Sequence, residues 1–201
     1  MNLLLQRLSV INSFIVRFGE TDLLVHSDKG LDVEFSALGL NHEQAIASYI
    51  TDFENAGEKT IHGYFGKPDW THAETVEKLE AWSLGKDLGD WVPSTTSFLI
   101  IDGRIVGNYN FRHSLTPDLM FFGGNCGYSV RPSERRKGYA TAMLQHAKSF
   151  GRTLGLTRML VTCSVDNIGS ARTIEKNNGV LQDVVYNPDV DEQIARYWID
   201  L

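Results

Sequence analysis

A basic, glycine-containing segment, Arg135–Ala140, has the residue types and spacing most suited to chemistry in this sequence. It lies between a predicted strand and a predicted helix, so its backbone N–H groups would form the open first turn of that helix. Such a turn attracts anions through its unpaired donors and the helix dipole. Gly138 would let a phosphate approach the backbone, and Arg135, Arg136 and Lys137 would add positive charge. The segment predicts a phosphate-binding turn, and a basic surface turn without a ligand remains the alternative.

Two other kinds of nucleotide site are excluded by their missing glycine patterns. The sequence has no GxxxxGK[ST] run, which would cradle the phosphates of a nucleoside triphosphate. It also has no GxGxxG opening a strand–helix–strand unit, as dinucleotide-binding folds require. The basic turn therefore belongs to neither of these classes.

The elements around this turn alternate between strand and helix, which is typical of an α/β layered fold. The turn is preceded by a strand over Gly123–Arg131 and followed by a helix that begins at Gly138 and carries one apolar stripe to Leu154. The remaining predicted elements of this half are a strand over Met159–Cys163, a helix over Asn167–Asn178 and strands over Val180–Val185 and Tyr197–Leu201.

The first half is less strongly patterned. Asn41 is expected to cap a helix that runs to Gly57, and a second helix is predicted over Thr71–Leu84. Strands over Ser97–Ile101 and Arg104–Phe111 are joined by Asp102-Gly103, a dipeptide that favours a tight hairpin turn. Residues 1–40 are expected to hold one or two strands and carry no chemistry that can be assigned.

Composition limits the class of protein. A chain of 201 residues with 42% hydrophobic residues can bury one sizeable core, so a single domain over residues 1–201 is predicted. The net charge of −6 disfavours a nucleic-acid partner and suits a small cationic substrate.

Cys126 and Cys163 are too few for a disulfide framework and lack the spacing of a metal site, so reduced thiols and no metal are expected. The apolar stretch Met1–Phe18 is interrupted by Arg7 and other polar residues, so neither a signal peptide nor a membrane span is predicted and the expected location is the cytoplasm.

Two motifs together resemble the GCN5-related N-acetyltransferase (GNAT) superfamily. Within Val130–Thr141, the residues Arg135, Gly138 and Ala140 match its acyl-CoA-binding pattern Q/R-x-x-G-x-G/A. Downstream, Asn167–Ser170 and Glu175–Gly179 are similar to its N-x-x-S…E-K-x-G segment. The wider context, including Val92–Thr96, Gly107–His113 and Tyr197–Leu201, resembles a branch of predicted bacterial acetyltransferases.

The resemblance covers about residues 41–201 and leaves residues 1–40 as an extension. It implies an α/β (α+β) fold with a mixed, mostly antiparallel sheet flanked by helices. It also implies a V-shaped opening between the strands Gly124–Arg131 and Met159–Cys163, which holds the pantetheine arm of acetyl-CoA. The residues implied to bind this co-substrate are Ser129, Val130 and Arg131 on the strand edge, Arg135, Arg136, Lys137, Gly138, Tyr139 and Ala140 at the turn, and Asn167. For Asn167, a helix N-cap is an equally good interpretation.

The acid–base residues are harder to assign. Family members commonly place a tyrosine general acid seven residues after the asparagine, and here that position is Ile174. His113 is the candidate base and Tyr128 the candidate proton donor, each with a purely structural alternative. The directions in which His62 and Glu34 point cannot be predicted from the sequence.

The resulting functional hypothesis is acetyl transfer from acetyl-CoA to a primary amine of a small molecule or peptide by direct nucleophilic attack. An acetyl-cysteine intermediate on Cys126 or Cys163 is not favoured, because strand cysteines usually behave as small core residues. Two alternatives stay open: a non-catalytic acyl-CoA sensor, and a phosphate-binding surface of unrelated purpose. No membrane partner is expected, and the oligomeric state is left between monomer and homodimer.

Overall fold

We describe a computed structural model of the chain, in which residues 6–7, 13–18, 21–26 and 32–201 can be described. Its largest sheet has four antiparallel strands in the order β4 (Val33–Ser36), β5 (Ser94–Ile101), β6 (Arg104–Arg112) and β7 (Cys126–Val130). A second sheet has the order β8 (Arg158–Ser164), β10 (Glu192–Asp200) and β9 (Val180–Asn187), again antiparallel. The predicted α/β class with a mostly antiparallel sheet is confirmed.

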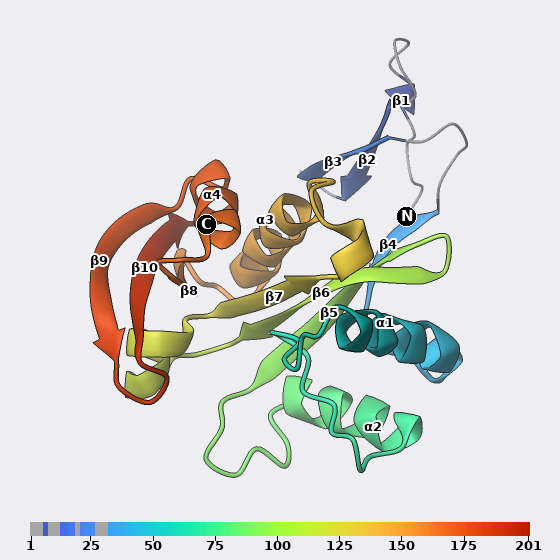
Figure 1. The fold of residues 1–201 in the computed structure, drawn as a ribbon, viewed down its shortest axis with the longest axis horizontal. Helices are drawn as coiled ribbons and strands as arrows, with labels where there is room; N and C mark the ends of the chain where they lie inside the picture. The colour runs from blue at the N-terminus through green and yellow to red at the C-terminus, as the bar shows by residue number, and fades with distance from the viewer. Residues whose placement is uncertain (1–5, 8–12, 19–20, 27–31) are drawn as a thin grey trace.

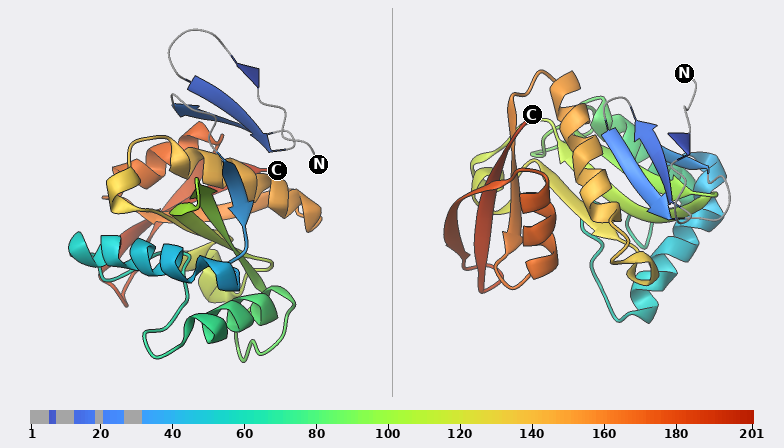
Figure 2. Two further views of the ribbon diagram at one scale, coloured as in Figure 1. Left: turned by 90° about the vertical axis from the view of Figure 1, so that its right-hand side faces the viewer. Right: turned by 90° about the horizontal axis from the view of Figure 1, so that it is seen from above.

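Helices cover both faces of the four-stranded sheet (Figures 1 and 2). One face is covered by α1 (Glu43–Asn55) and α2 (His72–Ser83), and the other by α3 (Tyr139–Thr153). The second sheet carries α4 (Ile168–Lys176). Short helical turns lie at Leu40–His42, Leu119–Gly123 and Pro132–Glu134. The chain is therefore layered, with one hydrophobic cluster on each face of the larger sheet.

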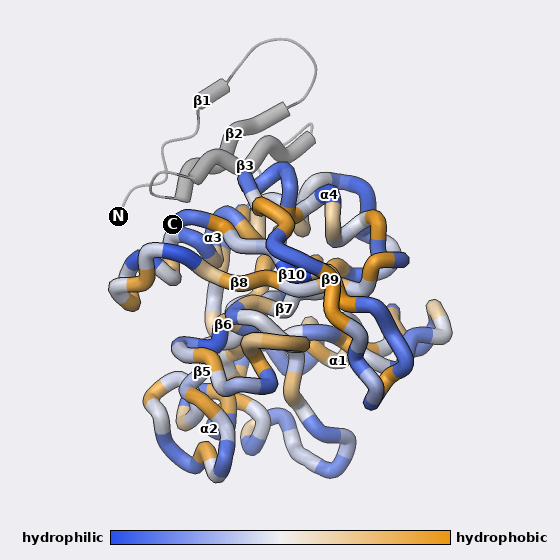
Figure 3. Tube along the Cα trace, turned by 90° about the vertical axis from the view of Figure 1, so that its left-hand side faces the viewer, coloured by the Kyte–Doolittle hydropathy of each residue, from blue (hydrophilic) through white to orange (hydrophobic). Residues whose placement is uncertain are grey.

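Apolar spacing explains why these helices dock. In α3, Met143, Leu144 and Ala147 are fully buried against β6 and β7, and each large side chain of this kind stabilises the fold by roughly 1.5–3 kcal/mol. In α1, Tyr49 and Phe53 are likewise fully buried, in the hydrophobic cluster on the opposite face of the sheet. Figure 3 shows hydrophobic residues on the packed strands and helix faces, and hydrophilic residues along most of the outer loops.

Local signals gave several boundaries correctly and others wrongly. For example, β10 begins at Glu192, five residues before the predicted start at Tyr197, and β7 begins at Cys126 instead of Gly123. Thr71 caps α2 with a capping box to Glu74, as the predicted start required. The Asp102-Gly103 hairpin has a positive φ at both residues, the conformation that this dipeptide favours. The predicted Asn41 cap is wrong, because Leu40–His42 forms a 3₁₀ turn and the N-cap of α1 is His42.

The first forty residues hold more regular structure than the one or two strands expected. They contain β1 (Gln6–Arg7), β2 (Ser13–Phe18) and β3 (Thr21–His26), which form a small antiparallel sheet in contact with α3 through β3. They also contain β4, which pairs with β5 as an edge strand of the largest sheet. Among the described residues, no helix is both long enough and apolar enough to cross a membrane.

The two sheets meet at one point and separate beyond it. Asn125 donates its backbone N–H to the Leu160 carbonyl (2.7 Å), and Leu160 donates its N–H to the Asn125 side chain (2.8 Å). Beyond this pair, β7 and β8 have no ladder with each other; β7 pairs with β6 and β8 with β10 among the described strands. The opening expected between these two strands is therefore present, with its vertex at Asn125 and Leu160.

Candidate active site

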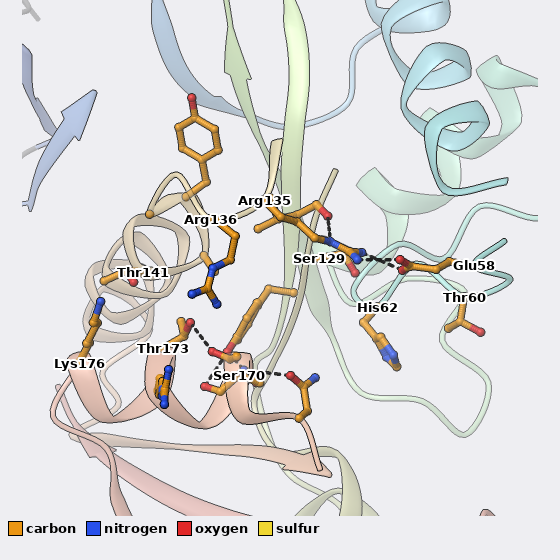
Figure 4. A pocket seen from close by; sticks show the side chains of 18 of the residues that line it. Glu58, Thr60, His62, Ser129, Arg135, Arg136, Thr141, Ser170, Thr173 and Lys176 are labelled. Carbon is orange, nitrogen blue, oxygen red and sulfur yellow. Dashed lines mark hydrogen bonds and ion pairs between the residues drawn. The ribbon is translucent and has the colours of Figure 1, made fainter. Parts of the chain in front are cut away.

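A pocket of about 740 Å³ lies where β7 and β8 separate (Figure 4). Its walls come from four parts of the chain: the end of β7, the turn leading into α3 with the first residues of that helix, one side of α4 from Asn167 to Lys176, and the loop after α1. This volume lies in the usual range for small-ligand sites. Segments far apart in the sequence therefore converge on one concave site.

The turn before α3 has the backbone conformation of an anion cradle. Arg136 and Gly138 both have positive φ, 67° and 87°, which turns successive N–H groups toward one side. A Cβ atom built on Gly138 would meet nothing within 4 Å, so the space beside its backbone is open. Gly138, Tyr139 and Ala140 line the pocket, and the first N–H groups of α3 have no partner inside the helix. This geometry suits a bound phosphate.

The free edge of β7 forms the adjoining wall. Arg131 donates its backbone N–H to Val106 on β6 (2.9 Å), and polar groups alternate sides along an antiparallel strand. The backbone N–H and C=O of Tyr128 and Val130 therefore point away from β6, toward the opening, where the Val130 carbonyl also accepts a hydrogen bond from Arg135 Nε (3.2 Å). An extended ligand with amide groups can pair with such an edge. Ser129 and Val130, both predicted to bind the co-substrate, line the pocket.

The three cations of the turn differ in their surroundings. Arg135 makes a bidentate ion pair with Glu58 in the loop after α1 (2.6 and 2.7 Å). The Glu58 carboxylate therefore neutralises the charge of Arg135. These hydrogen bonds raise the pKa of Arg135 and lower that of Glu58. Lys137 pairs with Glu134 and does not line the pocket. Arg136 lines it and forms no ion pair within the described residues.

Arg131 occupies a structural position. Its side chain is buried and contacts α1, where its guanidinium bonds to Asp52 (2.8 Å) and Ser48. Burial opposes ionisation of Asp52, but hydrogen bonds from Ser133 and Arg131 outweigh it and lower the pKa of that carboxyl. Arg131 is not among the residues lining the pocket, so its side chain holds the end of β7 against α1.

Two hydroxyl groups meet across the opening. Tyr128 from β7 and Ser170 from α4 lie 2.8 Å apart and both line the pocket. Burial raises the pKa of Tyr128, so it stays protonated at neutral pH. Asn167 caps α4 by accepting a hydrogen bond from the Ser170 N–H (3.0 Å) and also lines the pocket. The capping interpretation of Asn167 is confirmed, and a ligand contact stays a prediction.

Other sequence candidates lie outside the pocket. His113 follows the far end of β6, where its ring bonds to Thr95 (2.9 Å) and packs near Phe150. Ile174 is fully buried in the core, so its position offers no acid. Cys126 and Cys163 are both free and buried, as expected, and burial raises the pKa of Cys126 to about 12.

His62, whose direction the sequence did not predict, is a pocket residue. It lines the pocket from the loop after α1, and its carbonyl accepts a hydrogen bond from the buried Asn108 (3.2 Å). The next residue, Gly63, has φ of 77° and lies so close to Gly127 and Asn110 that a side chain would collide with their backbone atoms. The backbone beside His62 is thus fixed against β6 and β7. Within the described residues, no group of three or more His, Cys, Asp or Glu is placed to hold a metal ion.

An opening between splayed strands, a cradle before a helix and an outward-facing strand edge are brought together in one pocket, an arrangement that would suit an acyl-CoA ligand. The family model described as an acetyltransferase (GNAT) domain matches residues 42–180. The chain therefore belongs to the GNAT acetyltransferases, and the predicted enzyme class is confirmed.

Solved structures agree on the fold. One is an acetyltransferase from Salmonella typhimurium that modifies the N-terminal serine of ribosomal protein L7/L12 (TM-score 0.60, 15% identity, covering 84% of this chain and 95% of that one). Another is yncA of Salmonella typhimurium with acetyl-CoA (TM-score 0.57, 13% identity, 86% and 95%). A third is RimL, an L7/L12 α-N-protein acetyltransferase, in complex with coenzyme A (TM-score 0.61, 16% identity, 93% and 98%). No curated protein matches the chain in sequence.

Proposed function

We propose that this protein transfers the acetyl group of acetyl-CoA to a primary amine of a small molecule or peptide, by direct attack of the amine. One observation carries the proposal: the anion cradle at Gly138 and the free edge of β7 line the same pocket. Pyrophosphate and pantetheine are joined in coenzyme A, and these two walls offer complementary groups for each. Solved relatives of this fold with acetyl-CoA or coenzyme A bound support the choice of co-substrate.

Acetyl-CoA supplies an activated thioester when bound. The backbone N–H groups at Gly138–Ala140 would hold its pyrophosphate with Arg136, and the polar groups of Tyr128 and Val130 would pair with its amides. Arg135 would act indirectly, since its fork to Glu58 holds the loop after α1 against the cradle. The Arg135–Glu58 ion pair would thereby connect the wall that binds the co-substrate to the wall that faces the acceptor.

The acceptor must lose a proton before it can attack. A lysine-like amine with a pKa near 10.4 is neutral in about one part in a few thousand at pH 7, a cost of roughly 4–5 kcal/mol. We propose His62 as the base, because it lines the pocket and its backbone is fixed, whereas His113 lies outside it. Its side chain is exposed, so a proton accepted from the amine can pass to solvent.

The departing thiolate needs hydrogen-bond donors. Tyr128 and Ser170 supply two hydroxyls at the pocket wall, and Tyr128 stays protonated because burial raises its pKa. A thiolate is a tolerable leaving group, since an ordinary thiol has a pKa near 8.5. Hydrogen bonding by this pair would therefore suffice where the usual tyrosine is replaced by Ile174.

The proposed acceptor class follows from one structural relative and from the ordinary pKa of α-amino groups. The Salmonella typhimurium relative that modifies the N-terminal serine of L7/L12 acts on a protein N-terminus. The α-amino group of an N-terminus has a pKa of about 7.7–8.0. Such amines are already partly neutral at pH 7 and need little help from a base. Peptide N-termini therefore belong in the first acceptor screen beside small amines.

The deciding experiment measures release of the coenzyme A thiol from acetyl-CoA with pooled amines, including amino acids, polyamines, aminoglycosides and peptides. Amine-dependent thiol release supports the enzyme. Thermal stabilisation by acetyl-CoA without release from any pool would favour the acyl-CoA sensor, which the apolar Ile174 makes a genuine alternative. Equal stabilisation by unrelated polyanions would favour a general phosphate-binding surface.

A further inference from the structure

Three buried polar atoms without a partner gather on one face of the largest sheet. In the part of the chain that the structure describes, four buried side-chain nitrogen or oxygen atoms form no hydrogen bond, and three of them are Ser94 Oγ, Asn110 Oδ1 and Arg112 Nε. Ser94 lies opposite Arg112 in the ladder of β5 and β6, and Asn110 lies two residues before Arg112 on β6. All three side chains therefore share one face of the sheet. Buried polar groups are normally paired in native proteins, so their concentration at one place indicates a site for a ligand.

Arg112 is a buried cation without an acidic partner. It is 9% exposed, and its Nη1 donates to the carbonyls of Gly123 (2.9 Å) and Gly124 (3.1 Å). Its guanidinium also lies 5.9 Å from the centre of the Trp91 ring. No ion pair among the described residues includes Arg112. The neighbouring Cys126 does not balance its charge, because burial raises the pKa of that thiol to about 12 and keeps it neutral. A carboxylate could supply the missing counter-charge.

A small space lies beside this guanidinium, over Gly127 of β7, which pairs with Asn110. A Cβ atom built on Gly127 would have three nearest neighbours: Arg112 Nη2 at 3.6 Å, the backbone nitrogen of Gly63 at 3.8 Å and Arg112 Nη1 at 3.9 Å. We call this space the Gly127 notch. Within the described residues, neither Arg112 Nη2 nor the Gly63 N–H donates a hydrogen bond. Two donors with spare capacity, one of them charged, therefore border a space that can hold one small group.

The Gly127 notch adjoins the acceptor side of the pocket. Gly127 precedes Tyr128 and Gly63 follows His62, and both Tyr128 and His62 line the pocket. Consecutive Cα atoms are about 3.8 Å apart, so the notch lies one residue from the pocket wall on two separate segments. Figure 4 shows His62 on the opposite side of the pocket from Lys176. A group held in the notch would therefore be close to an amine placed beside His62.

We propose that the Gly127 notch binds a carboxylate of the acceptor, with Arg112 and the Gly63 N–H as donors, so that the preferred acceptor is an amine that also carries a carboxylate. This inference rests on the proposed function and narrows its acceptor class. Guanidinium and backbone N–H groups make charge-assisted hydrogen bonds to carboxylates. Free amino acids have such a group beside the amine, and so do peptides with an acidic residue next to the N-terminus. Polyamines lack it, so the small cationic substrate suggested by the net charge would be a poor acceptor.

The test measures kcat/KM for acetyl transfer by the full chain to matched acceptors. One pair is alanine and alaninamide, and the other is a dipeptide amide with aspartate or asparagine at its second position. We expect the wild type to prefer the carboxylate member of at least one pair by about 10–100-fold, as charge-assisted hydrogen bonds allow. The pair that shows the preference identifies whether the carboxylate comes from a free amino acid or from an acidic side chain.

Two variants place the preference in the Gly127 notch. Gly127→Ala fills the notch with a methyl group at ordinary contact distances and without a positive φ, so the fold should tolerate it. It should reduce kcat/KM for the carboxylate acceptor at least tenfold more than for the matched amide. Arg112→Met should lower the preference to a similar extent. Its control is Arg196→Met on β10, which removes another buried arginine that bonds to a backbone carbonyl, that of Met120, and lies over an aromatic ring, that of Phe121. This control should keep the preference.

The possible outcomes are distinct. Equal wild-type rates within both acceptor pairs would overturn the inference and leave the unpartnered atoms to buried water. A preference that survives in Gly127→Ala would overturn it too, as would equal losses toward both members of a pair in that variant. A loss of preference in Arg196→Met as large as in Arg112→Met would also count against it, because the effect would then come from stability. Failure of the wild type to acetylate any amine would instead refute the proposed function, and the inference with it.

Discussion

The hydroxyl of Tyr128 on β7 and the hydroxyl of Ser170 on α4 lie 2.8 Å apart, bridging the two halves of the protein across the pocket. The sheets touch at Asn125 and Leu160 and then separate, so this bond spans the opening beyond that contact. A hydroxyl has one proton to donate, so the bond between Tyr128 and Ser170 uses one of the pair's two protons and leaves at most one for a ligand. The pair is therefore both a structural link and the source of one donor.

Removal of the Tyr128 hydroxyl should slow acetyl transfer more than it weakens co-substrate binding. Tyr128→Phe keeps the packed ring but removes one donor, and we expect the turnover rate to fall about 10–100-fold. The affinity for acetyl-CoA should change by less than about threefold. Steady-state kinetics and calorimetry separate the two effects.

Tyr109→Phe is the matched control for this change. Tyr109 is also buried, with a raised pKa and a hydroxyl bonded to His146 (2.8 Å), but it does not line the pocket. A comparable loss of turnover in Tyr109→Phe would mean that both substitutions act through stability. Unchanged turnover in Tyr128→Phe would remove that hydroxyl from the chemistry.

Gly138→Ala should weaken acetyl-CoA binding through the backbone. Gly138 has φ of 87°, which an alanine adopts only at a cost of about 1–2 kcal/mol, so the turn should relax and misalign the N–H groups of the cradle. Gly155→Ala imposes similar strain at φ of 78° just after α3, again with open space around the new carbon. We expect similar losses of thermal stability in both variants but a loss of affinity, at least tenfold, only in Gly138→Ala. Equal affinities would contradict the cradle.

The pair of Asp52 and Arg131 should contribute to stability in a pH-dependent way. The folded pKa of Asp52 lies below its unfolded value, so its contribution is complete above about pH 4 and is lost as pH falls through the folded pKa. Asp52→Asn should cost about 1.5–3 kcal/mol at pH 7, because Arg131 is left buried without its charged partner. Urea unfolding at pH 7 and pH 3 should show the difference between variant and wild type shrinking in acid.

An exposed pair provides the comparison. Lys78 and Asp87 are 3.5 Å apart and largely exposed, so Asp87→Asn should change the free energy of unfolding by less than about 1 kcal/mol at either pH. If Asp52→Asn proved equally mild at pH 7, the Asp52–Arg131 pair would have no special role in holding β7 to α1.

The sequence predicted those parts of the site that depend on local rules. The cradle needs a glycine before a helix and a strand before it, and all of these lie within a few residues of Gly138. The cap at Asn167 depends on one hydrogen bond three residues along the chain. Short-range geometry of this kind is visible in residue types and spacing.

The remaining parts depend on contacts between distant segments. Arg131 directly precedes the turn, yet its buried guanidinium bonds to Asp52, 79 residues earlier. Glu58 meets Arg135 across a similar separation, and Gly63 packs against Gly127. Neither periodicity nor a motif marks such pairings, so the acceptor wall of the pocket was not predicted. In the same way, β4 was assigned to an extension because one edge strand of four residues carries little pattern of its own.

The two candidate bases can be separated by their dependence on the acceptor. Without a base, only amine that is already neutral can attack, so the rate should rise about tenfold per pH unit until the pKa of the amine is reached. His62→Ala should therefore slow transfer to a lysine-like amine by about 100-fold or more at pH 7, with a deficit that shrinks toward pH 9. For an α-amino acceptor, which is partly neutral at pH 7, the deficit should be smaller.

His113→Ala should stay within about twofold of wild type, because His113 bonds to Thr95 outside the pocket. Rates measured from pH 6 to pH 9 with one acceptor of each kind decide the matter. A selective loss in His113→Ala would return the role to that histidine, and parallel profiles in wild type and His62→Ala would leave ordered water as the base.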